Sequence, residues 1–255
     1  MVAAAARRAG SLTAGGQWAA FAMGTLVSAA GWGHAALLIG YFVASTLLTR
    51  LGAREKAART ASMLPSVTAR DATQVAANGG TFAALVLAGE AADAPLLLVA
   101  AAGALAAAAA DTWATEVGTL WGGRPRAVLG FATLEPGASG GVTWTGTAAG
   151  AVAAALVAAA AVALLRPAGV APAVVVPAVL FAGIGGCLGD SLLGASVQSK
   201  RWCDQCRTWT ERRVHTCQYR SKHARGIRWM TNDTVNFLAT VIGAGLALGV
   251  ASLLD

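Results

Sequence analysis

Five acidic side chains lie within or beside long apolar stretches of the chain: Asp71, Asp111, Glu116, Asp190 and Asp233. Carboxylates at membrane depth are costly, so they usually face a polar cavity and serve a function. Mg²⁺ prefers oxygen ligands and keeps water molecules that leave room for phosphate groups. We therefore predict a catalytic Mg²⁺ site built from Asp111, Glu116, Asp190 and Asp233.

The segment DTWATE contains two of these acids. On a helix, Asp111 faces Thr115 four residues later, and Thr112 faces Glu116 in the same way. The alternative is a solvated turn at the membrane interface. Short acids reach the interface less well than Lys or Arg, so we favour the metal site.

Asp190 stands in the segment GDSLLGASVQ, which ends an apolar run and leads into the most basic loop of the chain. On a helix, Asp190, Gly194 and Gln198 form one stripe. The glycines just before Asp190 permit close packing or a broken helix. Packing alone accounts for these glycines, but it does not account for the carboxylate.

The segment RDATQVAANGG adds amide and guanidinium groups. Asp71, Gln74 and Asn78 share one helix face directly after Arg70. Helix capping by Asp71 is the alternative, although Asn78 lies too deep in the helix to act as a cap. Because Arg binds phosphate through two hydrogen bonds, we predict that Arg70, Asp71 and Asn78 bind nucleotide or phosphate.

The segment TNDTVNF opens the last apolar run. Asn232 and Asn236 are four residues apart, with Asp233 on nearly the same face. Capping by Thr231 or Asn232 explains one of these polar residues and leaves the others unexplained. We add Asn232, Asn236 and Gln198 to the predicted binding residues.

A glycine-rich loop, EPGASGGVTWTG, enters another apolar run. Backbone N–H groups at a helix N-terminus bind phosphate, so Gly140 and Gly141 are candidate phosphate-binding residues. A plain connecting turn accounts for this loop equally well.

Three of the four cysteines cluster with a histidine in the basic loop, as Cys203, Cys206, His215 and Cys217. The spacing C-x2-C-x8-H-x-C offers four N and S ligands, which suit tetrahedral structural Zn²⁺, with His223 as a substitute for His215. Reduced thiols without metal are the alternative, and Cys187 is predicted to be a small core residue. RNA binding by the aromatic and basic residues of the loop is less favoured than contact with headgroups or nucleotide, because the loop connects two predicted spans.

The composition is that of an integral membrane protein. The chain has 255 residues, of which 56% are hydrophobic and 12% charged, whereas soluble domains have about 25% charged residues. We predict an all-α membrane protein with about seven membrane-spanning helices. These spans cover residues 12–30, 33–49, 73–89, 95–117, 145–165, 172–197 and 234–253. The whole chain, 1–255, forms one helical domain, into which the basic loop 199–231 is inserted.

The distribution of positive charge orients these helices. With seven spans, 18 of the 19 Lys and Arg residues lie on one side of the membrane, and Arg166 lies on the other with Glu90 and Asp93. Lys and Arg concentrate on the cytosolic side of membrane proteins. We therefore predict a multi-pass protein of the cell (inner) membrane, with its N-terminus in the cytosol.

The motifs RDATQVAANGG, DTWATE, PGASGGVT, GDSLLGASVQ, CxxC…HxC and NDTVNF follow one another in this order. In this the chain resembles the phytyl-phosphate kinase family of plastids and cyanobacteria, which includes the transmembrane protein 19 group and bacterial and archaeal members. The resemblance extends from about Tyr41 to the last predicted span. The chain departs from the pattern at Gln218, where a glycine is expected.

The resemblance implies transfer of a phosphoryl group from a nucleoside triphosphate, with CTP favoured, to an isoprenoid monophosphate. Phytyl, geranylgeranyl and farnesyl phosphate are the expected acceptors, and Mg²⁺ is the expected cofactor. A nucleotidyltransferase that makes a CDP-activated lipid and a lipid or ion transporter are the alternatives. The expected partners are the lipid, the nucleotide and the membrane, without nucleic acid, and homo-oligomerisation is left open.

Overall fold

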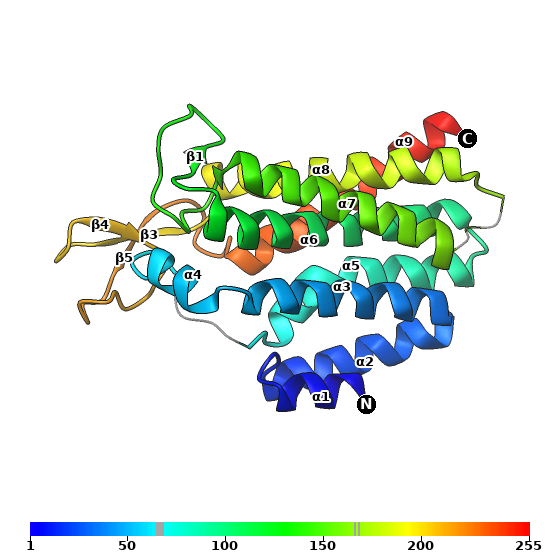
Figure 1. Cartoon of the computed structure of the whole chain (residues 1–255), viewed down its shortest axis with the longest axis horizontal. Coiled ribbons are helices and arrows are strands. Elements are labelled where there is room, and N and C mark those ends of the chain that lie inside the picture. The colour runs from blue at the N-terminus through cyan, green and yellow to red at the C-terminus, as the bar shows by residue number, and fades with distance from the viewer. Residues whose placement is uncertain (65–68, 166, 168) are drawn as a thin grey trace.

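The computed structural model describes residues 1–64, 69–165, 167 and 169–255. Its long helices run along the long axis of the molecule and form a bundle (Figure 1). They are α2 (Ala14–Ala30), α3 (Trp32–Arg50), α5 (Ala72–Ala91), α6 (Pro95–Trp121), α7 (Trp144–Leu164), α8 (Pro172–Ser196) and α9 (Asn232–Leu254). Each of the seven predicted apolar segments is therefore one continuous helix, and the predicted helical membrane fold is confirmed.

Helix starts follow from local sequence. The side chains of Thr13, Asp71, Thr143 and Thr231 each accept a hydrogen bond from a backbone N–H in the first turn of the helix that follows. Such caps satisfy N–H groups that have no partner within the helix. Helices α6 and α8 begin instead with a proline in the first turn, where the missing N–H costs nothing.

Among the described residues, five helices are long and apolar enough to cross a membrane: α3, α6, α7, α8 and α9. Helices α2 and α5 do not belong to this group. The total of seven spans therefore stays a prediction, whereas several apolar spans are established. Arg166, which was predicted to lie on the side opposite to the other basic residues, is outside the described residues.

The helix α6 lies at the centre of the bundle. Every residue from Ala100 to Ala110 is buried, and all of them except Leu105 are alanine or glycine. A Cβ atom on Gly103 would overlap Ala247 of α9, and one on Gly186 of α8 would overlap Ala107. Such small residues let membrane helices approach closely. The close packing holds α8 and α9 against α6, and all three helices continue to the polar end of the molecule.

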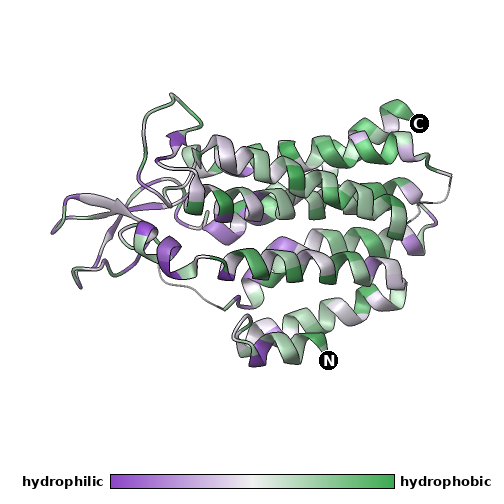
Figure 2. Ribbon diagram, viewed as in Figure 1, coloured by the Kyte–Doolittle hydropathy of each residue, from purple (hydrophilic) through white to green (hydrophobic). Residues whose placement is uncertain are grey.

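The structure adds elements that the sequence did not predict. Two short helices are α1 (Val2–Arg8) and α4 (Ala53–Thr60). Short strands form two antiparallel sheets, β1 (Arg126–Ala127) with β2 (Gly141–Val142), and β3 (Lys200–Cys203) between β4 (Thr208–Thr210) and β5 (Lys222–Arg225). The strands and α4 lie at one end of the bundle (Figure 1). Hydrophilic residues gather at this end (Figure 2), which we call the polar end.

Candidate functional site

A cavity of about 370 Å³ opens at the polar end. Its walls come from helices α3, α5, α6, α7, α8 and α9 and from the loops between them. The predicted site residues that line it are Arg70, Asn78, Asp111, Glu116, Gly140, Gly141, Asp190, Gln198, Asn232 and Asn236. Residues from distant parts of the sequence therefore meet in one space.

Asp111 of α6 and Asp190 of α8 are the two acids at the centre of this set. Both line the cavity, and their charges are close enough to interact. With its side-chain nitrogen turned toward these acceptors, Asn236 donates a hydrogen bond to Oδ2 of Asp190 at 3.0 Å and one to the carbonyl of Asn232 at 3.3 Å. Within the described ranges, neither acid has a Lys, Arg or His partner at ion-pair distance.

Glu116 lies one and a half turns further along α6 and has a cationic partner. Lys56 of α4 forms an ion pair with Glu116, and the hydroxyl of Thr49 donates a hydrogen bond to Glu116 Oε1 at 2.6 Å. The Lys56 side chain is 9% exposed and that of Glu116 is 18% exposed. The Glu116 carboxylate is thus already neutralised by the protein, unlike those of Asp111 and Asp190.

Arg70 is held on both its backbone and its side chain. Its N–H donates to the carbonyl of Ser11, and its own carbonyl accepts from Thr13, both at 3.0 Å. The guanidinium donates to Thr46 Oγ1 at 3.0 Å and lies 5.6 Å from the centre of the Phe42 ring. The guanidinium therefore has a fixed place at the cavity wall and retains donors for an anion.

The structure does not bring Asp71 and Asp233 into the cavity lining. Asp71 caps α5, because its carboxylate accepts from the Gln74 N–H at 2.9 Å while the Gln74 side chain accepts from the Asp71 N–H at 3.1 Å. Asp233 lies in the first turn of α9, where a negative charge is favourable at a helix N-terminus. The two carboxylates lie near each other and interact electrostatically.

The glycine-rich loop packs tightly on α8. Gly140 has φ +82°, and a Cβ atom there would lie 2.6 Å from Ala195. The N–H of Gly141 donates to the carbonyl of Ala138 at 3.1 Å, so this N–H is not free for a phosphate. Gln198 lies just beyond the end of α8 rather than on the predicted helical stripe, yet its buried side chain still faces the cavity.

Glu211, in the loop 199–231, is a cavity residue that the sequence analysis missed. It accepts hydrogen bonds from the Ser139 hydroxyl and from Gln198 Nε2, the latter at 3.2 Å. Burial raises the pKa of the Glu211 carboxyl, while the hydrogen bond from Ser139 and the charge of Lys200 oppose that rise. Glu211 is one of two acids, with Asp204, among the many basic residues of this loop, and its position at the cavity depends on how the loop folds.

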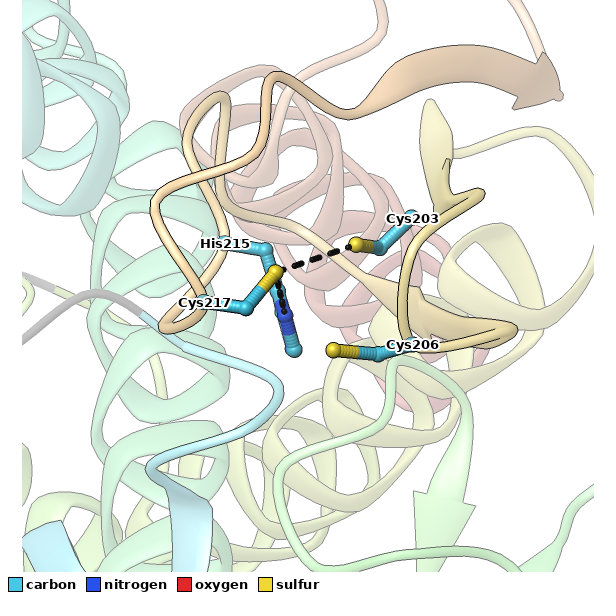
Figure 3. A group of neighbouring side chains, drawn as sticks. All are labelled: Cys203, Cys206, His215 and Cys217. Carbon is cyan, nitrogen blue, oxygen red and sulfur yellow. Dashed lines mark hydrogen bonds between the residues drawn. The ribbon is translucent and has the colours of Figure 1, made fainter.

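The predicted zinc ligands come together beyond the cavity. Side chains of Cys203, Cys206, His215 and Cys217 point toward a common centre (Figure 3), and their ligand atoms all lie within 4.8 Å of one another. His223 is not part of this group. The hydrogen bond with His215 lowers the pKa of the Cys217 thiol to about 6. A thiolate is the form of cysteine that binds metal.

A second, apolar groove of about 200 Å³ runs between α3, α6 and α7. Its lining includes Gly40, Trp113, Ala153 and Leu164, and at 1.5 Å per residue the last two are roughly 16 Å apart along α7. Tyr41 lines both the groove and the polar cavity. One side chain therefore marks the place where a polar space and an apolar space meet.

Comparisons with known proteins agree with a membrane fold. The model of the family described as "Integral membrane protein DUF92" matches residues 1–244. "Protein PGR" of Arabidopsis thaliana is 26% identical over 253 residues, covering 91% of this chain and 86% of the relative. "Uncharacterized membrane protein MJ0933" of Methanocaldococcus jannaschii is 27% identical over 216 residues, covering 84% of this chain and 74% of the relative.

No solved structure matches the chain. The family match spans nearly the whole sequence and agrees with the family resemblance drawn from the motifs. The chain belongs to the integral membrane protein family DUF92.

Proposed function

We propose that this membrane protein transfers a phosphoryl group from a nucleoside triphosphate to an isoprenoid monophosphate. One observation carries the proposal: the polar cavity and the apolar groove share Tyr41. An isoprenoid phosphate has the same two parts, an anionic head and an apolar tail. The tail would occupy the groove between α3 and α7, and its phosphate would reach the acids and Arg70.

The cavity has the donor set for Mg²⁺. Asp111 and Asp190 bring two carboxylates into one partly buried space, and neither forms an ion pair with a cationic side chain among the described residues. Carboxylates so close repel each other, and a divalent cation offsets that repulsion. Asp111 and Asp190 would hold the ion, which when bound neutralises charge on the transferring phosphate. Glu116, already paired with Lys56, would instead fix the wall of the cavity.

The chain's own residues would bind and orient the two phosphate groups. Arg70 offers two parallel N–H donors to phosphate oxygens. The amides of Asn78, Asn232 and Asn236 lie around the same space. Phosphoryl transfer depends mainly on such positioning and on charge stabilisation.

In the reaction, an oxygen of the lipid phosphate forms a bond to the γ-phosphorus while the bond from that phosphorus to the bridging oxygen breaks. The products are the lipid diphosphate and a nucleoside diphosphate. The acceptor oxygen is already ionised near neutral pH, so no histidine is needed as a base. With the polar end in the cytosol of a cell (inner) membrane, as its positive charge suggests, nucleotide would have direct access. The family resemblance favours CTP as the donor.

The test is a turnover assay with the purified full-length protein in detergent. Phytyl, geranylgeranyl or farnesyl phosphate is mixed with Mg²⁺ and each of CTP, ATP, GTP and UTP, and products are identified by mass spectrometry. We expect lipid diphosphate and nucleoside diphosphate in equal amounts. A CDP-lipid with pyrophosphate would instead identify a nucleotidyltransferase. If folded protein shows no turnover with any combination of lipid phosphate and nucleotide, both enzyme assignments are contradicted and a transporter is favoured.

A further inference from the structure

The four side chains of the Cys/His cluster are spaced as metal ligands are. Cys203 Sγ lies 3.6 Å from Cys217 Sγ, and Cys217 Sγ lies 3.3 Å from His215 Nδ1. Two sulfurs bound tetrahedrally to one Zn²⁺, each at about 2.3 Å, are roughly 3.8 Å apart. A disulfide would need about 2.05 Å. The observed separation is therefore that of two ligands around one ion.

The backbone turns sharply after each pair of ligands. Arg207, directly after Cys206, has φ +49°, and Gln218, directly after Cys217, has φ +65°. These are two of the four non-glycine residues with positive φ in the described part of the chain. The left-handed conformation is unfavourable for residues with a Cβ atom and persists where the surroundings require it. The same unusual turn after both pairs indicates that the ligand positions determine the backbone here.

Polar contacts support the second pair of ligands. The N–H of Gln218 donates to the carbonyl of His215 at 2.9 Å, and the N–H of Tyr219 donates to the Cys217 sulfur. His215 is only 4% exposed, and its Nε2 is buried without a hydrogen-bond partner in the described part of the chain. A buried imidazole nitrogen normally has a partner. A metal ion would use one ring nitrogen of His215.

We propose that Cys203, Cys206, His215 and Cys217 bind a structural Zn²⁺ ion, which positions Glu211 at the cavity. Three thiolates and one imidazole form a closed tetrahedral set of the kind found in structural zinc sites. Binding releases protons from thiols that are still protonated and involves no redox change. The site is independent of which reaction the cavity supports.

The connection to Glu211 follows from the path of the chain. Glu211 lies between the two ligand pairs, so the ion closes a loop that contains it. The N–H of Glu211 donates to the Met63 carbonyl at 2.9 Å, and Thr210 Oγ1 donates to the same carbonyl at 3.3 Å. These contacts join the metal-bound loop to the segment after α4. The zinc ion therefore acts on the cavity through the position of Glu211, without touching substrate.

The experiment measures metal in the full-length protein purified without chelator. Inductively coupled plasma mass spectrometry should find about one zinc ion per chain. His215→Gln and Cys206→Ser should reduce zinc at least tenfold, whereas His215→Cys should retain it as a Cys₄ site. His223→Gln and Cys187→Ser are the matched controls and should retain zinc. Limited trypsin digestion after zinc removal should cut the basic loop 199–231 at least tenfold faster than before removal.

A measurement on the wild-type protein covers the case in which variants do not fold. Thiol-specific mercurial should release zinc to a colorimetric indicator in step with modification of the three loop thiols. Zinc below about a tenth of an equivalent, with all cysteines freely reactive, would overturn the proposal. Iron in place of zinc would do so as well. Loss of zinc in His223→Gln but not in His215→Gln would refute the assigned ligand set.

Discussion

With its side-chain nitrogen turned toward the carboxylate, Asn236 donates a hydrogen bond to Asp190 at 3.0 Å, joining the start of α9 to the last third of α8. The bond orients the carboxylate within the cavity that it shares with Asp111. It also uses one lone pair of Oδ2 and leaves the other oxygen available to a cation. The amide thus serves to orient an acid whose charge the protein does not neutralise.

The Asp190→Asn substitution should lower kcat by at least about a hundredfold, because it removes the charge that would hold Mg²⁺ while it keeps the side-chain shape. The measurement is steady-state turnover in detergent, with the melting temperature as a check of folding. The matched control is Asp93→Asn, in the loop at the opposite end of the bundle, where φ is +49° and Asn is tolerated. Full activity in Asp190→Asn would remove this acid from the mechanism.

A bulky side chain at Gly40 should shorten the lipid that the protein accepts. Gly40 lines the apolar groove, and a Cβ atom there meets nothing within 4 Å, so Gly40→Phe should fill the groove without strain. We expect kcat/KM to fall at least about tenfold for phytyl phosphate, while a five-carbon isoprenoid phosphate is little affected. Gly24→Phe on α2 is the matched control, since its Cβ position is also open but lies outside the groove. Equal losses for long and short acceptors would contradict the assignment of the groove.

The ion pair between Lys56 and Glu116 predicts a large cost for removing one partner. Lys56→Met should destabilise the protein by about 3 kcal/mol, because it leaves a mostly buried carboxylate unpaired. Lys56→Met with Glu116→Gln should recover much of the loss, since neither partner is then charged. The melting temperatures of both single variants and the double variant test this coupling. Strictly additive effects would show that the pair contributes little.

Glu211 should make stability depend on pH. Its folded-state pKa is raised by burial from the ordinary value of 4.5, so the native protein binds more protons than the unfolded chain as pH rises above 4.5. Stability is therefore lost as pH rises through this range. Glu211 is surrounded by Lys200, Ser139, Gln198 and Asp190, and the Glu211→Gln substitution leaves these four residues unchanged.

In that variant, the melting temperature should fall less between pH 4.5 and pH 7 than it does in the wild type. Glu135→Gln is the control, because the Glu135 side chain is 60% exposed. A wild-type slope in Glu211→Gln, or the same change in both variants, would contradict the buried position of Glu211.

The turn at Gln218 should accept a glycine. Relief of the left-handed strain is worth about 1–2 kcal/mol, and the greater freedom of glycine in the unfolded chain offsets about half of it. Gln218→Gly should therefore slow tryptic cleavage of the loop 199–231 two- to fivefold and keep zinc. Gln205→Gly is the control, since Gln205 lies in the same loop without a positive φ. Faster cleavage of Gln218→Gly would show that the side chain itself supports the turn.

The helices were predictable because all of the apolar runs except that of α3 begin at a side-chain cap or a proline. The site was predictable where a polar residue interrupts such a run. Asp111 and Asp190 are of this kind. The same reasoning added Asp71 and Asp233 to the predicted site, although they do not line the cavity. Periodicity predicts the face of a helix on which a residue lies, but it does not predict which polar residues stabilise the start of the helix instead. Glu211 and Lys56 were out of reach, because their positions depend on a small sheet and a short helix that pack on the bundle only in three dimensions.

The alanine-rich run of α6 affects how the axial alignment of the helices in the bundle is determined. Apart from Gly103 and Leu105, every residue from Ala100 to Ala110 is alanine, so most of the run does not distinguish one axial position of the helix from the next. A one-residue shift would turn Asp111 by about 100° away from Asp190. The exceptions carry the information: the buried Leu105 side chain, and the close contacts of Gly103 with Ala247 and of Gly186 with Ala107, where a Cβ atom on the glycine would overlap its neighbour. These contacts set the register of α6, whose sequence is otherwise mostly alanine here, and thereby orient its carboxylate.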